Sequence, residues 1–228
     1  EALARMGETL SSGLERNDDE SWQPDGRPHL VTYQTGHALV IVESEGRKVN
    51  VNTTPPEQLR LVFERAGLED GASEHLADLV ADFVDADEFR RLHGGEKEYY
   101  ESAGAPSQPF NAPMLSLDQM LLIPGMTPQV FYGFTAGPPE KNPYGELWDP
   151  VLPARNSLFS LLTVYGKNRL LVDDEAWDEN EQKIITWEKG GIYRILSLGR
   201  SRHGPPSILI WLVVKYLGDG DKGYEVLY

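Results

Sequence analysis

The spacing of apolar residues changes along the chain, and each spacing predicts a different kind of element. Near the start the apolar positions recur every three or four places, which predicts a helix with one apolar face. Residues 37–43 are rich in β-branched side chains and residues 47–52 alternate polar with apolar, so the turn between them predicts a β-hairpin. The apolar positions of the first helix are Ala2, Leu3, Met6, Leu10 and Leu14.

Helical spacing returns after this hairpin. One helix is predicted to start at Thr54, with Thr54 as its N-cap and Glu57 reaching back to the cap. A second helix is predicted from Ser73. Residues 116–119 repeat the capping-box pattern, and Thr127 followed by proline predicts a further short helix. The middle of the chain is therefore predicted to be a helical block.

The last third of the chain has the pattern of strands separated by glycine and proline turns. The predicted strands are 158–164, 183–187, 191–198, 207–217 and 223–227.

This order of elements predicts the α+β class. The simplest arrangement packs the N-terminal helix on an antiparallel sheet built from both β portions, with the helical block inserted between them. We predict a first segment, 1–54, with the helix and the first hairpin, and an inserted α-helical domain, 55–150, with an acidic loop. Residues 151–228 are predicted to be antiparallel strands that complete the sheet.

Charge and composition exclude several classes of partner and site. The 228 residues carry 21 Lys plus Arg against 36 Asp plus Glu, a formal net charge of −15 at pH 7, which disfavours nucleic acid and anionic membranes. The absence of cysteine excludes disulfides and thiolate metal sites. No apolar run reaches the ~20 residues that span a bilayer. Because Glu1 already lies within a helical pattern, we expect a hydrophobic segment to precede it.

An acidic cluster follows the second predicted helix. Between Glu57 and Glu101 thirteen Asp or Glu stand against five Lys or Arg. Carboxylates are unfavourable at a helix C-terminus, so the cluster is either a solvated face or a site where a cation offsets the repulsion. Oxygen ligands suit calcium better than a transition metal, although the spacing lacks the glycine and one ligand of an EF-hand. The cluster consists of Asp82, Asp85, Asp87 and Glu88, with Glu96 following Gly94–Gly95.

Catalytic and nucleic-acid motifs are weak or absent. The sequence has no nucleophile elbow, P-loop or zinc-helix motif, and His93 is interpreted as a loop residue rather than a ligand. Residues 123–126 are similar to the hairpin of helix-hairpin-helix modules, but Pro128 has no N–H to donate to a phosphate. We therefore predict that the protein is not an enzyme and does not bind nucleic acid.

Six stretches occur in a characteristic order: Arg47–Leu59, Leu79–Asp87, Gly95–Tyr100, Asn111–Met120, Ile123–Met126 and Leu162–Tyr165. Together they resemble the type II secretion system minor pseudopilin K family. The resemblance implies a pilin-like fold and a hydrophobic N-terminal helix that anchors a periplasmic domain in the bacterial inner membrane. It also implies a role in protein secretion at the tip of the pseudopilus, with I-type and J-type minor pseudopilins and secreted cargo as partners.

The same resemblance implies calcium binding, by one or two ions, in the inserted domain. The residues carried over by position are Asp82, Asp85, Asp87, Glu96 and Tyr100. The chain departs from the family after residue 165, where it passes quickly to the final strands, so its inserted domain is shorter than usual. Two other functions stay open: a minor pilin of a type IV pilus or DNA-uptake system, and a carboxylate-dependent glycosidase.

Overall fold

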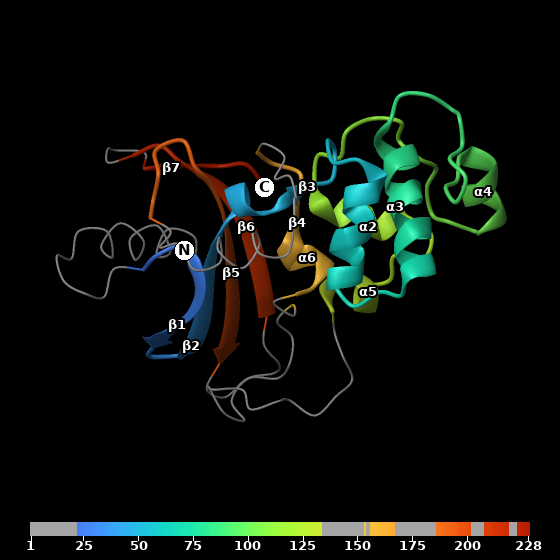
Figure 1. Ribbon diagram of the computed structural model, residues 1–228. Coiled ribbons are helices and arrows are strands. Elements are labelled where there is room, and N and C mark those ends of the chain that lie inside the picture. Colours follow the sequence, from blue (N-terminus) through green and yellow to red (C-terminus); the bar gives the residue numbers. More distant parts are fainter. Residues whose placement is uncertain (1–21, 134–152, 154–155, 167–185, 202–207, 219–222) are drawn as a thin grey trace. The chain divides into compact units, whose positions relative to one another are not determined.

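The chain is divided into two compact units. The computed structural model describes residues 22–133, 153, 156–166, 186–201, 208–218 and 223–228 (Figure 1). The sheet unit consists of Glu1–Gly46 and Glu181–Tyr228, and the helical unit consists of Arg47–Asn180. The predicted inserted domain, 55–150, lies wholly within the helical unit, whose limits are wider than those predicted.

An antiparallel sheet of five strands forms the sheet unit, in the order β1-β2-β5-β6-β7. A two-residue turn joins β1 to β2, and β5 and β6 continue the sheet with an unbroken register from Ile192 opposite Lys215 to Gly199 opposite Ile208. The predicted α+β class is therefore confirmed. The strands are β1 (Asp25–Tyr33), β2 (Gly36–Ser44), β5 (Ile192–Ser201), β6 (Ile208–Tyr216) and β7 (Tyr224–Val226).

The core of the sheet unit comes from alternate positions on the central strands. Val40 and Val42 of β2 pack with Ile195 of β5 and Val214 of β6 on one face. Their neighbours on the other face, such as Leu198, are buried as well, which explains why β2 reads as a continuous apolar run.

A buried ion pair lies at the end of β2. The guanidinium of Arg194 meets the carboxylate of Glu45 with two contacts, Nε–Oε1 at 2.9 Å and Nη2–Oε2 at 3.1 Å. Glu45 belongs to the short 3-10 helix η1 (Glu45–Arg47), where the chain leaves the sheet unit. The guanidinium carbon also lies 5.5 Å from the centre of the Trp211 ring. Both charges are therefore paired inside the protein.

The helical unit is built around the contact of two helices that follow one another in the chain. Leu59, Val62 and Phe63 on the first helix and Leu79 and Phe83 on the second are all fully buried. The elements are β3 (Val49–Asn50), α2 (Pro56–Arg65), α3 (Asp70–Val84), α4 (Lys97–Ser102), η2 (Leu117–Leu122), α5 (Pro128–Tyr132), α6 (Leu158–Leu161) and β4 (Leu162–Thr163).

Two of the three predicted helix caps are confirmed. The Ser116 hydroxyl accepts from the amide of Asp118 and forms a capping box with Gln119 at the start of η2. Thr127 accepts from the Val130 amide at the start of α5. The predicted Thr54 cap is wrong, because its hydroxyl donates to the Asn50 carbonyl instead and α2 starts without a side-chain cap.

The predicted hairpin of 37–43 with 47–52 is also wrong. β1 rather than 47–52 forms the hairpin with β2. In the helical unit β3 pairs in parallel with β4, which follows the short helix α6 within the predicted strand 158–164. The polar positions of 47–52 make distant contacts instead: the Asn52 side chain exchanges two hydrogen bonds with the Met114 backbone, at 2.8 and 2.9 Å.

Of the other four predicted strands, three and part of the fourth can be compared with the structure. β5, β6 and β7 confirm the strands predicted at 191–198, 207–217 and 223–227. Residues 2–14 and 183–185 lie outside the described residues, and Thr186 and Trp187 are not in a strand. Among the helices that the structure describes, none has the length and apolar character needed to cross a membrane.

Candidate functional site

The loop from α3 to α4, residues 85–96, is organised by one buried carboxylate. Asp82 lies in the last turn of α3 and is fully buried. Its Oδ2 accepts from the amide of Gly95 at 2.9 Å and from the amide of Arg91 at 3.1 Å. A Cβ atom on Gly94 would collide with this carboxylate, so glycine allows the loop backbone to approach it.

Other side chains form hydrogen bonds with the backbone of this loop. Asp78 accepts from the amide of His93 at 3.0 Å, and Asp87 accepts from the amide of Phe89 at 2.8 Å. Asn111 donates from Nδ2 to the carbonyl of Asp87 at 2.9 Å and adopts φ of 48°, a left-handed conformation that asparagine tolerates. The acidic residues therefore fix the path of the loop.

One guanidinium partly neutralises the cluster. Arg91 Nη2 lies 3.1 Å from Asp85 Oδ2, and Arg91 Nε lies 3.4 Å from Asp82 Oδ1. Burial nevertheless raises the pKa of Asp82 and that of Asp85. Burial, followed by repulsion from Asp82, Asp85, Asp87 and Glu88, raises the pKa of Glu96 to about 7. The cluster therefore keeps negative charge that the neighbouring cation does not offset.

Four buried oxygen atoms in this region form no hydrogen bond. They are Asp85 Oδ1, Glu96 Oε1, Tyr100 Oη and Asn111 Oδ1. The Tyr100 side chain is fully buried, and burial followed by the charges of Asp82 and Glu96 raises the pKa of its hydroxyl. Buried polar atoms are normally paired, so these oxygens need a ligand or water that satisfies them.

Glu96 and Asn111 also line an open groove of about 780 Å³. The groove lies along α4 and the segment 108–111, with the ring of Phe110 in its wall. Two of the four residues with an unpaired oxygen therefore border solvent-accessible space.

The structure gives the five sequence-predicted residues different positions. The Asp82 carboxylate accepts hydrogen bonds from backbone amides. Asp85, Glu96 and Tyr100 each have a buried oxygen without a hydrogen bond, and Asp87 is exposed. Within the part of the chain that is described, no three Asp, Glu or His side chains are already arranged to hold a metal ion. The four unpaired oxygens have the hard chemistry that calcium prefers, so the donor set fits calcium better than a transition metal.

Asn111 was missed by sequence reasoning. The segment 101–113 has no apolar period, and nothing local distinguishes this asparagine from a turn residue. Its carbonyl becomes a candidate ligand because residue 111 folds back onto residue 87, 24 positions earlier in the chain.

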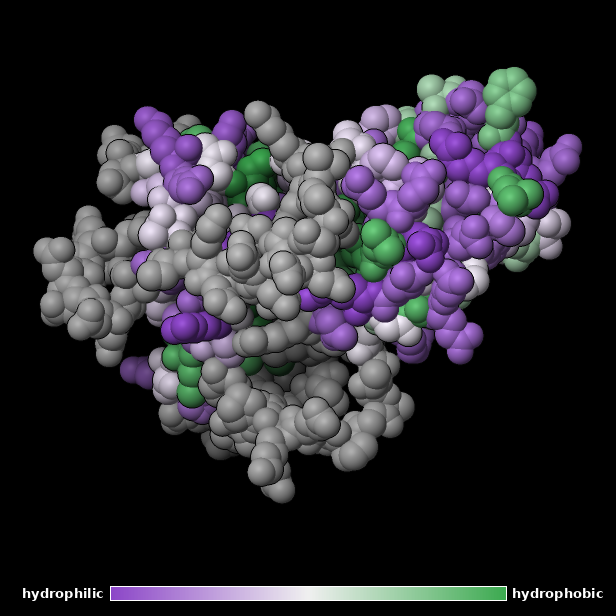
Figure 2. All heavy atoms as spheres, viewed as in Figure 1, coloured by the Kyte–Doolittle hydropathy of each residue, from purple (hydrophilic) through white to green (hydrophobic). Residues whose placement is uncertain are grey.

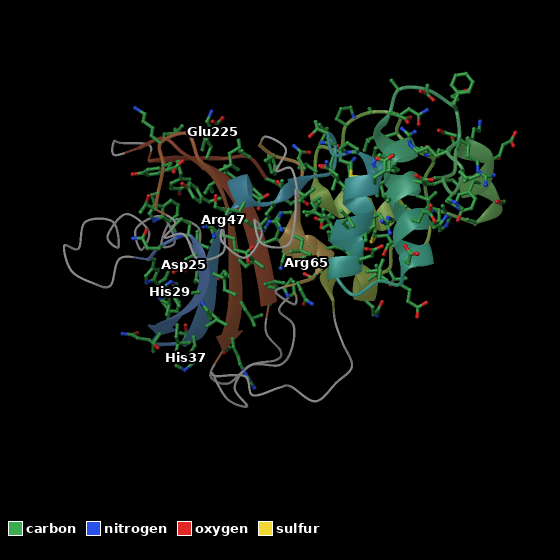
Figure 3. All side chains as sticks on the ribbon, viewed as in Figure 1. Asp25, His29, His37, Arg47, Arg65 and Glu225 are labelled. Atoms are coloured by element: carbon green, nitrogen blue, oxygen red, sulfur yellow. The ribbon has the colours of Figure 1, made fainter. Side chains whose placement is uncertain are left out.

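Each of the four histidines that the structure describes has a partner other than the four unpaired oxygens. His29 on β1 stacks on Trp22 with ring centres 4.6 Å apart, and His37 on β2 lies 3.3 Å from the Thr32 hydroxyl (Figure 3). In the helical unit His75 Nε2 contacts the Tyr99 hydroxyl at 3.0 Å, and His93 Nε2 lies 3.6 Å from Glu74. This geometry agrees with the interpretation of His93 as a loop residue.

Residues 37–133 match the family model of the "Type II secretion system (T2SS), protein K". Over this stretch the chain is similar to protein K. The match contains the whole α3–α4 loop and runs from β2 of the sheet unit through α5 of the helical unit. The resemblance inferred from the sequence is therefore confirmed.

One curated relative carries the same description. The "Putative type II secretion system protein K" of Escherichia coli (strain K12) is 25% identical over 77 residues, which cover 34% of this chain and 24% of that protein. The chain thus spans about a quarter of the length of this curated relative.

The second relative shows the fold. It is a chain from the crystal structure of the GspK-GspI-GspJ complex of the enterotoxigenic Escherichia coli type 2 secretion system, with 14% identity and a TM-score of 0.53. The likeness covers 100% of this chain and 92% of that chain.

Proposed function

We propose that this protein is a minor pseudopilin of a type II secretion system, which caps the tip of the periplasmic pseudopilus. The observation that carries the proposal is the match of residues 37–133 to protein K, together with a fold likeness that covers 100% of the chain. The matching chain comes from a complex of GspK, GspI and GspJ, so the partners proposed here are the I-type and J-type minor pseudopilins.

The proposed role divides the work between the two units. In a pilin-like subunit the antiparallel sheet and an N-terminal helix pack against sister subunits, and we assign this role to the sheet unit. The helical unit is proposed to exclude a further subunit, so that the protein occupies the end of the filament. The role is one of recognition, without catalysis, in a periplasmic domain held at the inner membrane by an N-terminal anchor.

Complex formation tests this proposal. The chain is mixed with the soluble parts of the I-type and J-type subunits of the same bacterium, and the mass of the product is measured by light scattering after gel filtration. We expect one stable ternary complex. Failure of the three proteins to associate, or immunogold labelling along the whole length of pseudopili, would contradict the tip role.

The same proposal includes one calcium ion at the α3–α4 loop. Asp85, Glu96 and Asn111 would supply oxygen ligands, with Asp87 and Tyr100 beside them, and Asp82 would position the loop. Its support is the set of four buried oxygens without hydrogen bonds and the raised pKa of Glu96. A bound calcium would supply positive charge where the carboxylates repel one another, and this would stabilise the folded loop.

A further inference from the structure

Two large apolar side chains of the α3–α4 loop face solvent. Phe89 is 83% exposed and Leu92 is 82% exposed. Figure 2 shows apolar side chains standing on an otherwise hydrophilic surface near α4. Single exposed apolar residues are ordinary on protein surfaces, so exposure alone does not indicate a binding site.

The loop backbone around these two residues is fixed. The amide of Phe89 donates to Asp87, and the amides on either side of Leu92, at residues 91 and 93, donate to Asp82 and Asp78. These bonds prevent the loop from folding over to bury its own apolar side chains. A surface that is already ordered loses little conformational entropy when a partner binds, so this loop is preorganised for contact.

Charge indicates the chemistry of the partner. Residues 85–98 contain five carboxylates and three basic side chains, a formal charge of −2. One of the three, Arg91, is already paired with Asp85. Exposed acidic groups at Asp87 and Glu88 directly precede Phe89. An anionic lipid surface would be repelled, whereas a protein surface with basic side chains would be attracted.

We propose that Phe89 and Leu92 form a docking site for a second protein, which offers an apolar pocket bordered by Lys or Arg side chains. Phe89 is the anchor that fills the pocket, Leu92 covers its edge, and the carboxylates of the loop meet the basic border. A few large buried side chains carry most of the energy of such interfaces. The inference concerns this loop alone and does not depend on the tip role.

Photo-crosslinking in the native bacterium provides the first test. The probe p-benzoylphenylalanine replaces Phe89 in one strain and Leu115 in a control strain, because Leu115 is equally exposed, at 81%, and lies in the same unit. We expect one protein adduct at position 89, a crosslinked peptide beside Lys or Arg residues, and loss of most of the adduct when Leu92→Ser is added. Equal adducts at both positions, or no protein adduct at position 89, would overturn the proposal.

The affinity for the crosslinked protein provides the second test. Phe89→Ala should weaken binding by tenfold or more, and raising the salt concentration should weaken the wild type further, whereas Leu115→Ala should change the affinity less than twofold. Circular dichroism and thermal unfolding verify that each variant is folded. Binding of vesicles of phosphatidylcholine and phosphatidylglycerol that depends on Phe89, without a protein adduct, would replace the protein pocket with a lipid surface.

Discussion

The two units of the chain bury charge in opposite ways. In the sheet unit, the buried carboxylate of Glu45 meets one guanidinium through two contacts, so each charge has its counterpart within the fold. In the helical unit, Asp82 and Asp85 share the guanidinium of Arg91, and Asp85 and Glu96 each keep a buried oxygen without a hydrogen bond.

The difference indicates what each unit needs in order to be stable. A buried pair with good geometry requires no other component, although removal of one partner leaves an uncompensated charge. A cluster with excess carboxylates is stable only if it binds a cation or protons. We therefore regard the sheet unit as self-sufficient and the acidic loop as dependent on its solution conditions.

The largest expected effect is the loss of the buried ion pair. Arg194→Met removes the guanidinium that meets the buried carboxylate of Glu45, which should cost about 3–5 kcal/mol in the free energy of unfolding. The double variant Glu45→Met with Arg194→Met removes both charges and should be clearly more stable than the single variant. Chemical denaturation, followed by tryptophan fluorescence, measures both. Equal destabilisation by the single and double variants would show that packing, and not charge, explains the loss.

A smaller effect is expected from the carboxylate that organises the loop. Asp82→Ala leaves the amides of Arg91 and Gly95 without an acceptor, and this should cost about 2–4 kcal/mol. It should also make residues 85–96 sensitive to protease in the folded protein. The control is Asp70→Ala, which removes an exposed ion pair with Arg60 and should cost less than about 1 kcal/mol. A protease-resistant loop in the Asp82 variant would contradict the role given to this residue.

The smallest effect is a pH dependence without calcium. The pKa of Glu96 is about 7 in the folded protein against an ordinary 4.5, so the folded state binds this proton more tightly than the unfolded state. In EDTA the stabilisation should be complete below about pH 4.5 and should be lost as the pH rises through about 7.

Denaturant midpoints measured between pH 5 and pH 8 provide the test. Glu96→Gln should flatten the profile, whereas Glu98→Gln, an exposed change in the first turn of α4, should leave it as in the wild type. If the denaturant midpoint of the wild type does not change between pH 5 and pH 8, the idea that excess negative charge raises the pKa of Glu96 is wrong.

Local patterns explain what could be predicted from the sequence. The strands β5 to β7 and the caps at Ser116 and Thr127 depend on residues that are neighbours in the chain, so alternation and capping residues were enough. The parallel pairing of β3 with β4 joins Val49 to Leu162, which no local pattern encodes. Thr54 has the residue type of a cap, but a backbone carbonyl at Asn50 competes for its hydroxyl.

The candidate site, too, could be predicted only as far as local patterns reach. The spacing of Asp82 and Asp85 in the sequence predicted that both lie near the end of α3, and their charge led us to expect a cation. The spacing could not show that backbone amides occupy Asp82, that Arg91 returns to Asp85, or that Asn111 faces the same region, because these contacts depend on the fold of the loop. Only the structure therefore separates the candidate ligands from Asp82, which organises the loop.

The central claim is that the acidic loop requires a cation, and thermal unfolding in EDTA and then in millimolar calcium tests it most directly. Magnesium is the control for charge alone, and Glu96→Gln is the control for the site. At about 100 times its dissociation constant, calcium should add roughly 2.7 kcal/mol to the free energy of unfolding, a rise of several degrees in Tm. We predict a rise that is selective for calcium and is lost in Glu96→Gln. The same Tm in EDTA and in calcium would contradict the account.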